Sequence, residues 1–138
     1  MSACILLIED NAANMELMCY LLQCFGYAVI TAEDGESGLA IANAHAPDLV
    51  LCDIHLPKLD GFGVVKALKQ SAATTAVPII AVTAQAMVGD RDRLLHAGFD
   101  GYLCKPLEVT TFISQVEAFL ALSLRSSQAH LLPASAAT

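Results

Sequence analysis

The amino-acid sequence predicts an α/β fold, a doubly wound sheet of five parallel strands with helices on both faces. Short apolar runs alternate with longer amphipathic segments along most of the chain, which is typical of repeated βα units. Three of the short runs are almost continuously apolar, as expected of strands that are covered on both faces. The length of 138 residues suits one domain with a hydrophobic core.

The apolar runs place the five expected strands at 4–8, 27–32, 48–53, 77–83 and 100–104. Helical spacing of apolar residues places the expected helices at 12–25, 35–46, 62–71, 86–97 and 107–122. Asn11 or Asn14 is expected to cap the first helix. The helix over 86–97 has the weakest pattern, because Gly89 and Asp90 interrupt it. We expect one domain over residues 1–122 and a disordered C-terminal tail over 123–138.

Composition excludes several classes of protein. No run approaches the ~18 apolar residues that cross a bilayer, and the start of the chain lacks the pattern of a signal peptide. The formal net charge of −7 argues against a nucleic-acid surface. The five cysteines form no CxxC pair and are expected to be small buried residues in a reducing compartment. A cytoplasmic protein is therefore expected.

Polar residues follow four of the five expected strands. In parallel sheets the site lies beyond the carboxyl ends of the strands, where the strand order reverses. There the first strand presents Glu9 and Asp10, the third presents Asp53, the fourth presents Thr83 and the fifth presents Lys105. The fold should therefore bring these five side chains to one edge of the sheet.

This set of side chains points to phosphoryl transfer. Three neighbouring carboxylates repel one another unless a cation neutralises them, and acidic oxygen ligands suit Mg²⁺. Lys105 adds a positive charge and Thr83 adds a hydroxyl donor, which together suit a phosphoryl group. Asp53 is then the expected nucleophile, forming an aspartyl phosphate.

Four stretches carry a resemblance to a known family. "LIEDN", "PDLVLCDIHLPKLDG", "PIIAVTAQAM" and "GYLCKPL" occur in this order, and the chain from about Ile5 to Leu122 resembles a bacterial response-regulator receiver domain of two-component systems. It is similar to single-domain regulators and to the receivers of hybrid histidine kinases. The resemblance implies a flavodoxin-like (βα)5 fold with strand order 2-1-3-4-5.

The resemblance also implies roles for the residues at the strand ends. Asp53 corresponds to the phosphoacceptor. Asp10 is expected to bind Mg²⁺ directly and Glu9 through water, with the backbone carbonyl of His55 as a further ligand. Thr83 is expected to hydrogen-bond the phosphoryl oxygen.

On the fifth strand, Lys105 is expected to pair with the phosphate and to precede a cis bond to Pro106. Tyr102 matches the aromatic residue that turns inward when Thr83 moves. The surface of the fourth helix, fifth strand and fifth helix would then bind a downstream protein. The phosphate would come from a histidine kinase or a histidine phosphotransfer protein. The implied protein is a signalling switch, which catalyses only its own phosphorylation and slow autodephosphorylation.

Two further positions are expected to tune the lifetime of the phosphate. His55 lies two residues beyond Asp53, and Gln85 lies two residues beyond Thr83. Both should flank the path of an attacking water. The hypothesis is that His55 alters the dephosphorylation rate, in a direction that the sequence does not give.

Three other functions fit the sequence less well. A flavodoxin-like electron carrier would need a Gly/Ser/Thr-rich phosphate loop where "EDNAAN" stands. A haloacid-dehalogenase-like phosphatase would need an acid where His55 stands. A scaffold that is never phosphorylated fits the intact set of site residues less well. No DNA-binding segment follows Leu122, so the output is expected to be protein binding or onward transfer in a phosphorelay. A free-standing protein is favoured over a receiver excised from a hybrid kinase.

Overall fold

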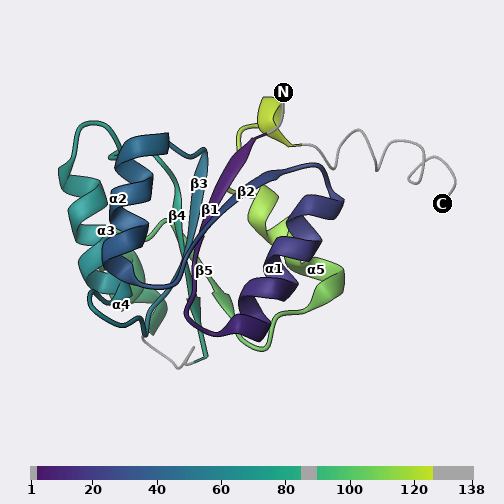
Figure 1. Ribbon diagram of the computed structural model, residues 1–138, viewed down its shortest axis with the longest axis horizontal. Helices are drawn as coiled ribbons and strands as arrows, with labels where there is room; N and C mark the ends of the chain where they lie inside the picture. Colours follow the sequence, from purple (N-terminus) through teal and green to yellow (C-terminus); the bar gives the residue numbers. More distant parts are fainter. Residues whose placement is uncertain (1–2, 85–89, 126–138) are drawn as a thin grey trace, which may run out of the picture.

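The computed structural model describes residues 3–84 and 90–125. Within them, five strands and five α-helices alternate along the chain, as the sequence predicts (Figure 1). The strands are β1 Cys4–Ile8, β2 Ala28–Ala32, β3 Leu49–Asp53, β4 Ile79–Thr83 and β5 Gly101–Cys104. The helices are α1 Ala12–Cys24, α2 Gly35–His45, α3 Gly61–Gln70, α4 Asp90–Ala97 and α5 Val109–Glu117, followed by a 3-10 helix, η1, at Leu122–Leu124.

The strands form one parallel sheet in the order β2-β1-β3-β4-β5, which confirms the doubly wound fold. Ile8 at the end of β1 is in register with Cys52 of β3, and Asp53 is in register with Val82 of β4. The carboxyl ends of the three central strands therefore lie side by side. The chain order reverses between β1 and β3, which is where such folds place their sites.

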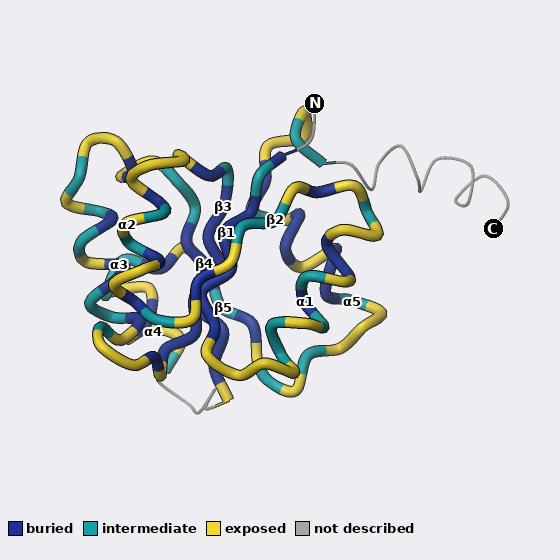
Figure 2. The backbone as a smooth tube through the Cα atoms, viewed as in Figure 1, coloured by how far each residue is buried: buried dark blue, intermediate teal, exposed yellow. Residues whose placement is uncertain are grey.

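Helices cover both faces of the sheet. Helices α1 and α5 pack on one face and α2, α3 and α4 on the other (Figure 1). Ile5 and Leu7 of β1 belong to the first core, and Leu6 and Ile8 belong to the second. Because successive side chains of a strand point to opposite faces, β1 must be apolar throughout. Figure 2 shows the central strands β1, β3 and β4 buried between helices whose residues are partly buried and partly exposed.

Short polar side chains start α1, α2 and α3. In each case the side-chain oxygen of the capping residue accepts a hydrogen bond from a backbone N–H of the first turn. The pairs are Asn11 with Asn14 at 2.9 Å, Asp34 with Ser37 at 2.7 Å and Asp60 with Gly63 at 2.9 Å. Each cap contributes about 1 kcal/mol to stability. Of the two candidates for the first cap, Asn11 is the residue used.

The fifth helix is shorter than the sequence pattern predicts. It ends at Glu117, because the next turn tightens: the N–H of Phe119 donates to Val116 O at 3.1 Å and that of Leu120 to Glu117 O at 3.0 Å. Leu120 still packs in the core, which explains why the apolar pattern continues past the helix. The fourth helix is described from Asp90 onward. The proposed boundary after residue 122 stays a prediction.

The expectation that the cysteines are small buried residues is wrong for two of them. Cys52 is buried, whereas Cys24 and Cys104 are exposed and the other two are half-buried. Cys24 ends α1, and Cys104 ends β5, an outer strand of the sheet, so neither is covered on all sides. None of the described helices has the length and hydrophobicity that crossing a bilayer requires.

Candidate metal and phosphoryl site

Three carboxylates meet at the carboxyl edge of the sheet. Glu9 and Asp10 follow β1 and Asp53 ends β3, and one ligand oxygen of each lies within 4.8 Å of the others. The register explains this meeting, since Ile8 and Cys52 are paired and each precedes an acid. Glu9 and Asp53 are buried, whereas Asp10 is exposed, so one side of the cluster is open to solvent.

Lys105 is the cation that faces this cluster. Its Nζ lies 2.9 Å from Glu9 Oε1 and 3.1 Å from Asp53 Oδ2, with a side chain only 16% exposed. Its backbone N–H donates to Thr83 O at 2.8 Å, which fixes the end of β5 against β4. The peptide bond between Lys105 and Pro106 is cis, as expected from the resemblance.

The charge at Glu9 is poorly compensated. Burial raises the pKa of the Glu9 carboxyl, and the nearby Lys105 ammonium only partly offsets this. The Asn11 N–H donates to Oε2 at 3.2 Å, and the buried Oε1 faces the Lys105 ammonium at 2.9 Å. Burial lowers the pKa of Lys105, but its pairs with Glu9 and Asp53 outweigh burial and raise it. A divalent cation fits here, because the cluster holds three carboxylates and Lys105 pairs with two of them.

Asp53 is held from both sides. Its Oδ1 accepts the backbone N–H of His55 at 3.2 Å, while its Oδ2 faces Lys105. A Cβ at Gly61, the first residue of α3, would lie 2.6 Å from the Asp53 carbonyl oxygen. Glycine is therefore required where α3 approaches the end of β3. The His55 side chain itself is exposed.

Two of the remaining predicted site residues, Thr83 and Tyr102, lie on β4 and β5. Thr83 is buried at the end of β4, beside Cys104 of β5. Tyr102 is half-buried and packs against the core on the α2, α3 and α4 side of the sheet. Gln85 lies outside the described residues. The structure thus brings Glu9, Asp53 and Lys105 into direct contact.

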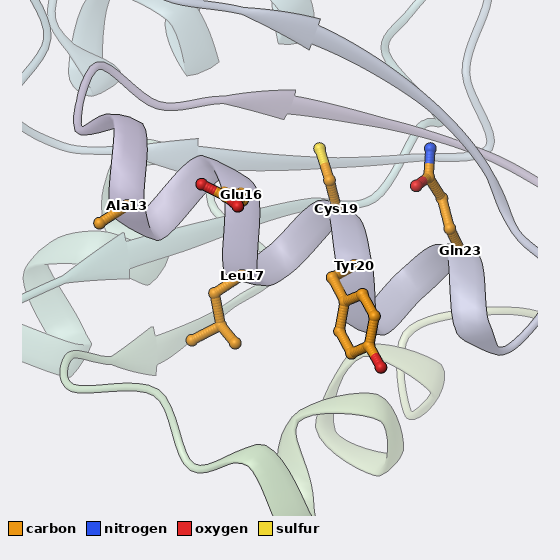
Figure 3. Close-up of a pocket in the computed structure, with 6 residues that line it drawn as sticks. All are labelled: Ala13, Glu16, Leu17, Cys19, Tyr20 and Gln23. Carbon is orange, nitrogen blue, oxygen red and sulfur yellow. The ribbon is translucent and has the colours of Figure 1, made fainter.

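Among the described residues, surface grooves also lie outside this cluster. One follows α1 and is lined by Ala13, Glu16, Leu17, Cys19, Tyr20 and Gln23. Figure 3 shows Leu17 and Tyr20 on one side of that helix, with Cys19 and Gln23 on the opposite side. Another lies beside β5 and α5 and is lined by Tyr102, Cys104, Pro106, Glu108, Thr111, Ser114 and Gln115. This second groove includes the expected switch residue.

Comparison with known proteins decides the family. The model of the response regulator receiver domain matches residues 5–117. The chain belongs to the response-regulator receiver family. This confirms the resemblance found in the sequence. Receivers are signalling modules of two-component systems, and membership implies a histidine kinase as phosphodonor.

Among relatives of this receiver, the polar-differentiation response regulator DivK of Brucella ovis is 39% identical over 120 residues, which cover 87% of this chain and 98% of DivK. Among solved structures, the receiver domain of the sensor histidine kinase PA1611 from Pseudomonas aeruginosa has a TM-score of 0.79 and 34% identity, covering 86% of this chain and 98% of that one. That structure holds a magnesium ion in its active-site cleft. Vibrio cholerae CheY4 has a TM-score of 0.83 and 28% identity, covering 87% of this chain and 100% of its own.

Some residues that shape the receiver site were missed from the sequence. The sequence pattern did not single out Gly61, although its missing Cβ makes room for the Asp53 backbone. The backbone N–H of Asn11, which supports Glu9, belongs to a residue noted only as a cap. A signal was present in "LDGFG", where two glycines follow the capping Asp60.

Proposed function

We propose that this chain is a phosphorylation-activated receiver, in which Asp53 accepts a phosphoryl group from a phosphohistidine donor in the presence of Mg²⁺. The observation that carries the proposal is the charge imbalance at the sheet edge. Lys105 is shared between Glu9 and Asp53, so one ammonium faces two buried carboxylates. A site with excess negative charge favours binding of a metal cation, and the bound cation can then neutralise the charge of an incoming phosphoryl group.

The residues divide the chemistry among them. Glu9, Asp10, Asp53 and the backbone carbonyl of His55 would hold the metal ion, which supplies charge neutralisation between the acids and the phosphoryl oxygens. A carboxylate oxygen of Asp53 attacks phosphorus. The new O–P bond forms as the N–P bond of the donor breaks, and its electron pair leaves on the imidazole nitrogen.

Lys105 and Thr83 act on the transferred group. The Lys105 ammonium, already 3.1 Å from Asp53 Oδ2, would pair with a phosphoryl oxygen, and the Thr83 hydroxyl would donate to another. Phosphorylation of Asp53 adds a local charge of about −1.5 to −2, which biases Thr83 and Tyr102 toward a second arrangement. The surface of α4, β5 and α5 would then bind a downstream protein.

The donor would be a histidine kinase or a histidine phosphotransfer protein. A place in a phosphorelay or a hybrid kinase remains an alternative for the same chemistry. We further propose that His55 and Gln85 tune the phosphate lifetime. Equal dephosphorylation rates in the wild type and His55→Ala would contradict that role for His55.

The test is intact mass after incubation with acetyl phosphate, with and without Mg²⁺, beside Asp53→Asn. The proposal predicts one phosphate adduct that requires Mg²⁺ and is absent in the variant. An adduct that persists in Asp53→Asn would contradict the assignment of Asp53.

Some receivers do not react with small donors, so a beryllofluoride titration with Mg²⁺ follows if no adduct forms. Binding in the wild type and loss in Asp53→Asn would support the same site. If beryllofluoride also leaves the protein unchanged, the chain is a scaffold that is never phosphorylated.

A further inference from the structure

The loop between β3 and α3, residues 54–60, is bonded at its start to Asp53 and to β4. The His55 N–H donates to Asp53 Oδ1 at 3.2 Å. The preceding N–H, of Ile54, donates to Val82 O at 3.3 Å. A shift of this loop therefore moves a hydrogen-bond donor of the reacting carboxylate.

The N-terminus of α2 holds the other end of the same loop. The Gly35 N–H reaches Pro57 O at 3.4 Å. A Cβ at Gly35 would lie 2.7 Å from the Leu59 carbonyl carbon and closer still to its oxygen, so only glycine permits this approach. Lys58, between Pro57 and Leu59, adopts a left-handed φ of 70°, and its Nζ lies 3.7 Å from Asp34 Oδ2.

The Leu59 side chain fills the space between α2 and α3. It is half-buried and packs against the core on that side of the sheet. A Cβ at Gly63, in the first turn of α3, would lie 2.9 Å from Leu59 Cγ. Leu56, earlier in the loop, is buried as well. Because packed interiors transmit strain, the loop has little room to slide.

We propose that the N-terminus of α2 clamps the β3–α3 loop and thereby sets the position of His55 against Asp53. Gly35 and Leu59 are then positioning residues for the metal and phosphoryl site, although neither belongs to the carboxylate cluster. The inference rests on the proposed function. Groups that orient metal ligands change metal affinity by roughly 10-fold to 100-fold when they are lost.

The test uses two opposite changes. Leu59→Ala removes the packed side chain, and we expect Mg²⁺ affinity, measured by calorimetry, to fall about tenfold. Gly35→Ala pushes on the loop backbone, and we expect a loss nearer to a hundredfold. Ile79→Val, a mild core truncation at the start of β4, is the control. It should lower stability and leave Mg²⁺ affinity within about twofold of the wild type.

A double-variant cycle separates backbone from side-chain contact. A Cβ at Gly63 would clash with the Leu59 side chain and meet Asp60 Oδ1 only at an ordinary contact distance of 3.6 Å. Adding Leu59→Ala to Gly63→Ala should therefore return the protein to the behaviour of Leu59→Ala alone. Gly35→Ala meets the Leu59 carbonyl, so the same addition should not rescue it. Should Gly35→Ala fail to fold, the Gly63 pair and Leu59→Ala carry the test.

The His55 amide resonance in metal-free protein gives a readout that does not depend on function. The clamp predicts that this resonance shifts in Leu59→Ala and Gly63→Ala and stays in place in Ile79→Val. Folded Leu59→Ala with an unchanged resonance and wild-type Mg²⁺ affinity would overturn the clamp. If the wild type binds no Mg²⁺, the proposed function fails, and the resonance alone decides the clamp.

Discussion

Two buried glutamates lie at opposite ends of the sheet, and their surroundings differ. Glu9, at the carboxyl edge, faces Asp10 and Asp53 and shares one lysine with the latter. Glu117, at the end of α5 near the opposite edge, accepts a hydrogen bond from the buried hydroxyl of Tyr27. Both residues are at most 6% exposed.

The difference separates a structural carboxylate from a functional one. The Tyr27–Glu117 pair joins residues 90 positions apart and satisfies a buried acid within the fold. Glu9 has a raised pKa and shares Lys105 with Asp53, so the fold alone leaves its charge only partly compensated. Groups that the fold leaves unsatisfied are the ones that a ligand can satisfy.

The largest effect is expected from Lys105→Met. This change removes the cation from the carboxylate cluster, and breaking a buried pair costs about 3 kcal/mol of unfolding free energy in the metal-free protein. Mg²⁺ should then restore more stability than it adds to the wild type. Urea unfolding with and without Mg²⁺ measures both effects. Lys66→Met, at an exposed lysine on α3, is the control, and equal losses in the two variants would contradict the account.

Tyr27→Phe should have the next largest effect. It leaves the buried Glu117 without the phenol donor, which costs about 1–3 kcal/mol. Unlike Lys105→Met, this variant should gain no extra stability from Mg²⁺, because the pair lies away from the cluster. Tyr20→Phe, at a tyrosine that is 65% exposed, should change unfolding by less than about 0.5 kcal/mol. If Mg²⁺ stabilised Tyr27→Phe more than the wild type, the distinction between a structural Glu117 and a functional Glu9 would be contradicted.

Glu9→Gln should have the smallest effect and the opposite sign. Because burial raises the pKa of Glu9, the ionised form costs stability at neutral pH, and the neutral isostere should raise the melting temperature of the metal-free protein by a few degrees.

The gain is present above the folded pKa of Glu9. It should shrink as the pH falls below that pKa and vanish below the ordinary pKa of a glutamate, where the carboxyl is protonated in both the folded and the unfolded protein. Thermal melts across this range, with Glu16→Gln at an exposed position of α1 as control, check the sign. A less stable Glu9→Gln at neutral pH would show that the Lys105 pair outweighs burial.

The carboxylate cluster could be predicted because its signal lies in residues that are adjacent in the sequence. Apolar runs end at Ile8 and Cys52, acids follow at once, and parallel strands must carry their ends to one edge. Most element bounds followed from the same pattern to within a few residues, whereas the strand order was implied by the family resemblance. The exceptions arose where apolar periodicity outlasts the helix, as at Leu120.

Pairs distant in sequence were not predictable in this way. Glu117 stands one helical turn after Ile113 on the apolar side of α5, which is a visible signal, but nothing in the sequence names Tyr27 as its partner. The close approach of Gly35 to Leu59 likewise depends on how α2 and α3 pack. Such contacts are set by tertiary packing, which a single sequence does not encode in any short pattern.

The most direct test of the central claim is a calorimetric Mg²⁺ titration of the wild type, Glu9→Gln and Glu117→Gln. The account predicts one Mg²⁺ site in the wild type, strong weakening in Glu9→Gln and unchanged affinity in Glu117→Gln. Equal Mg²⁺ affinity in all three proteins would contradict the claim that Glu9 belongs to a metal site and Glu117 does not.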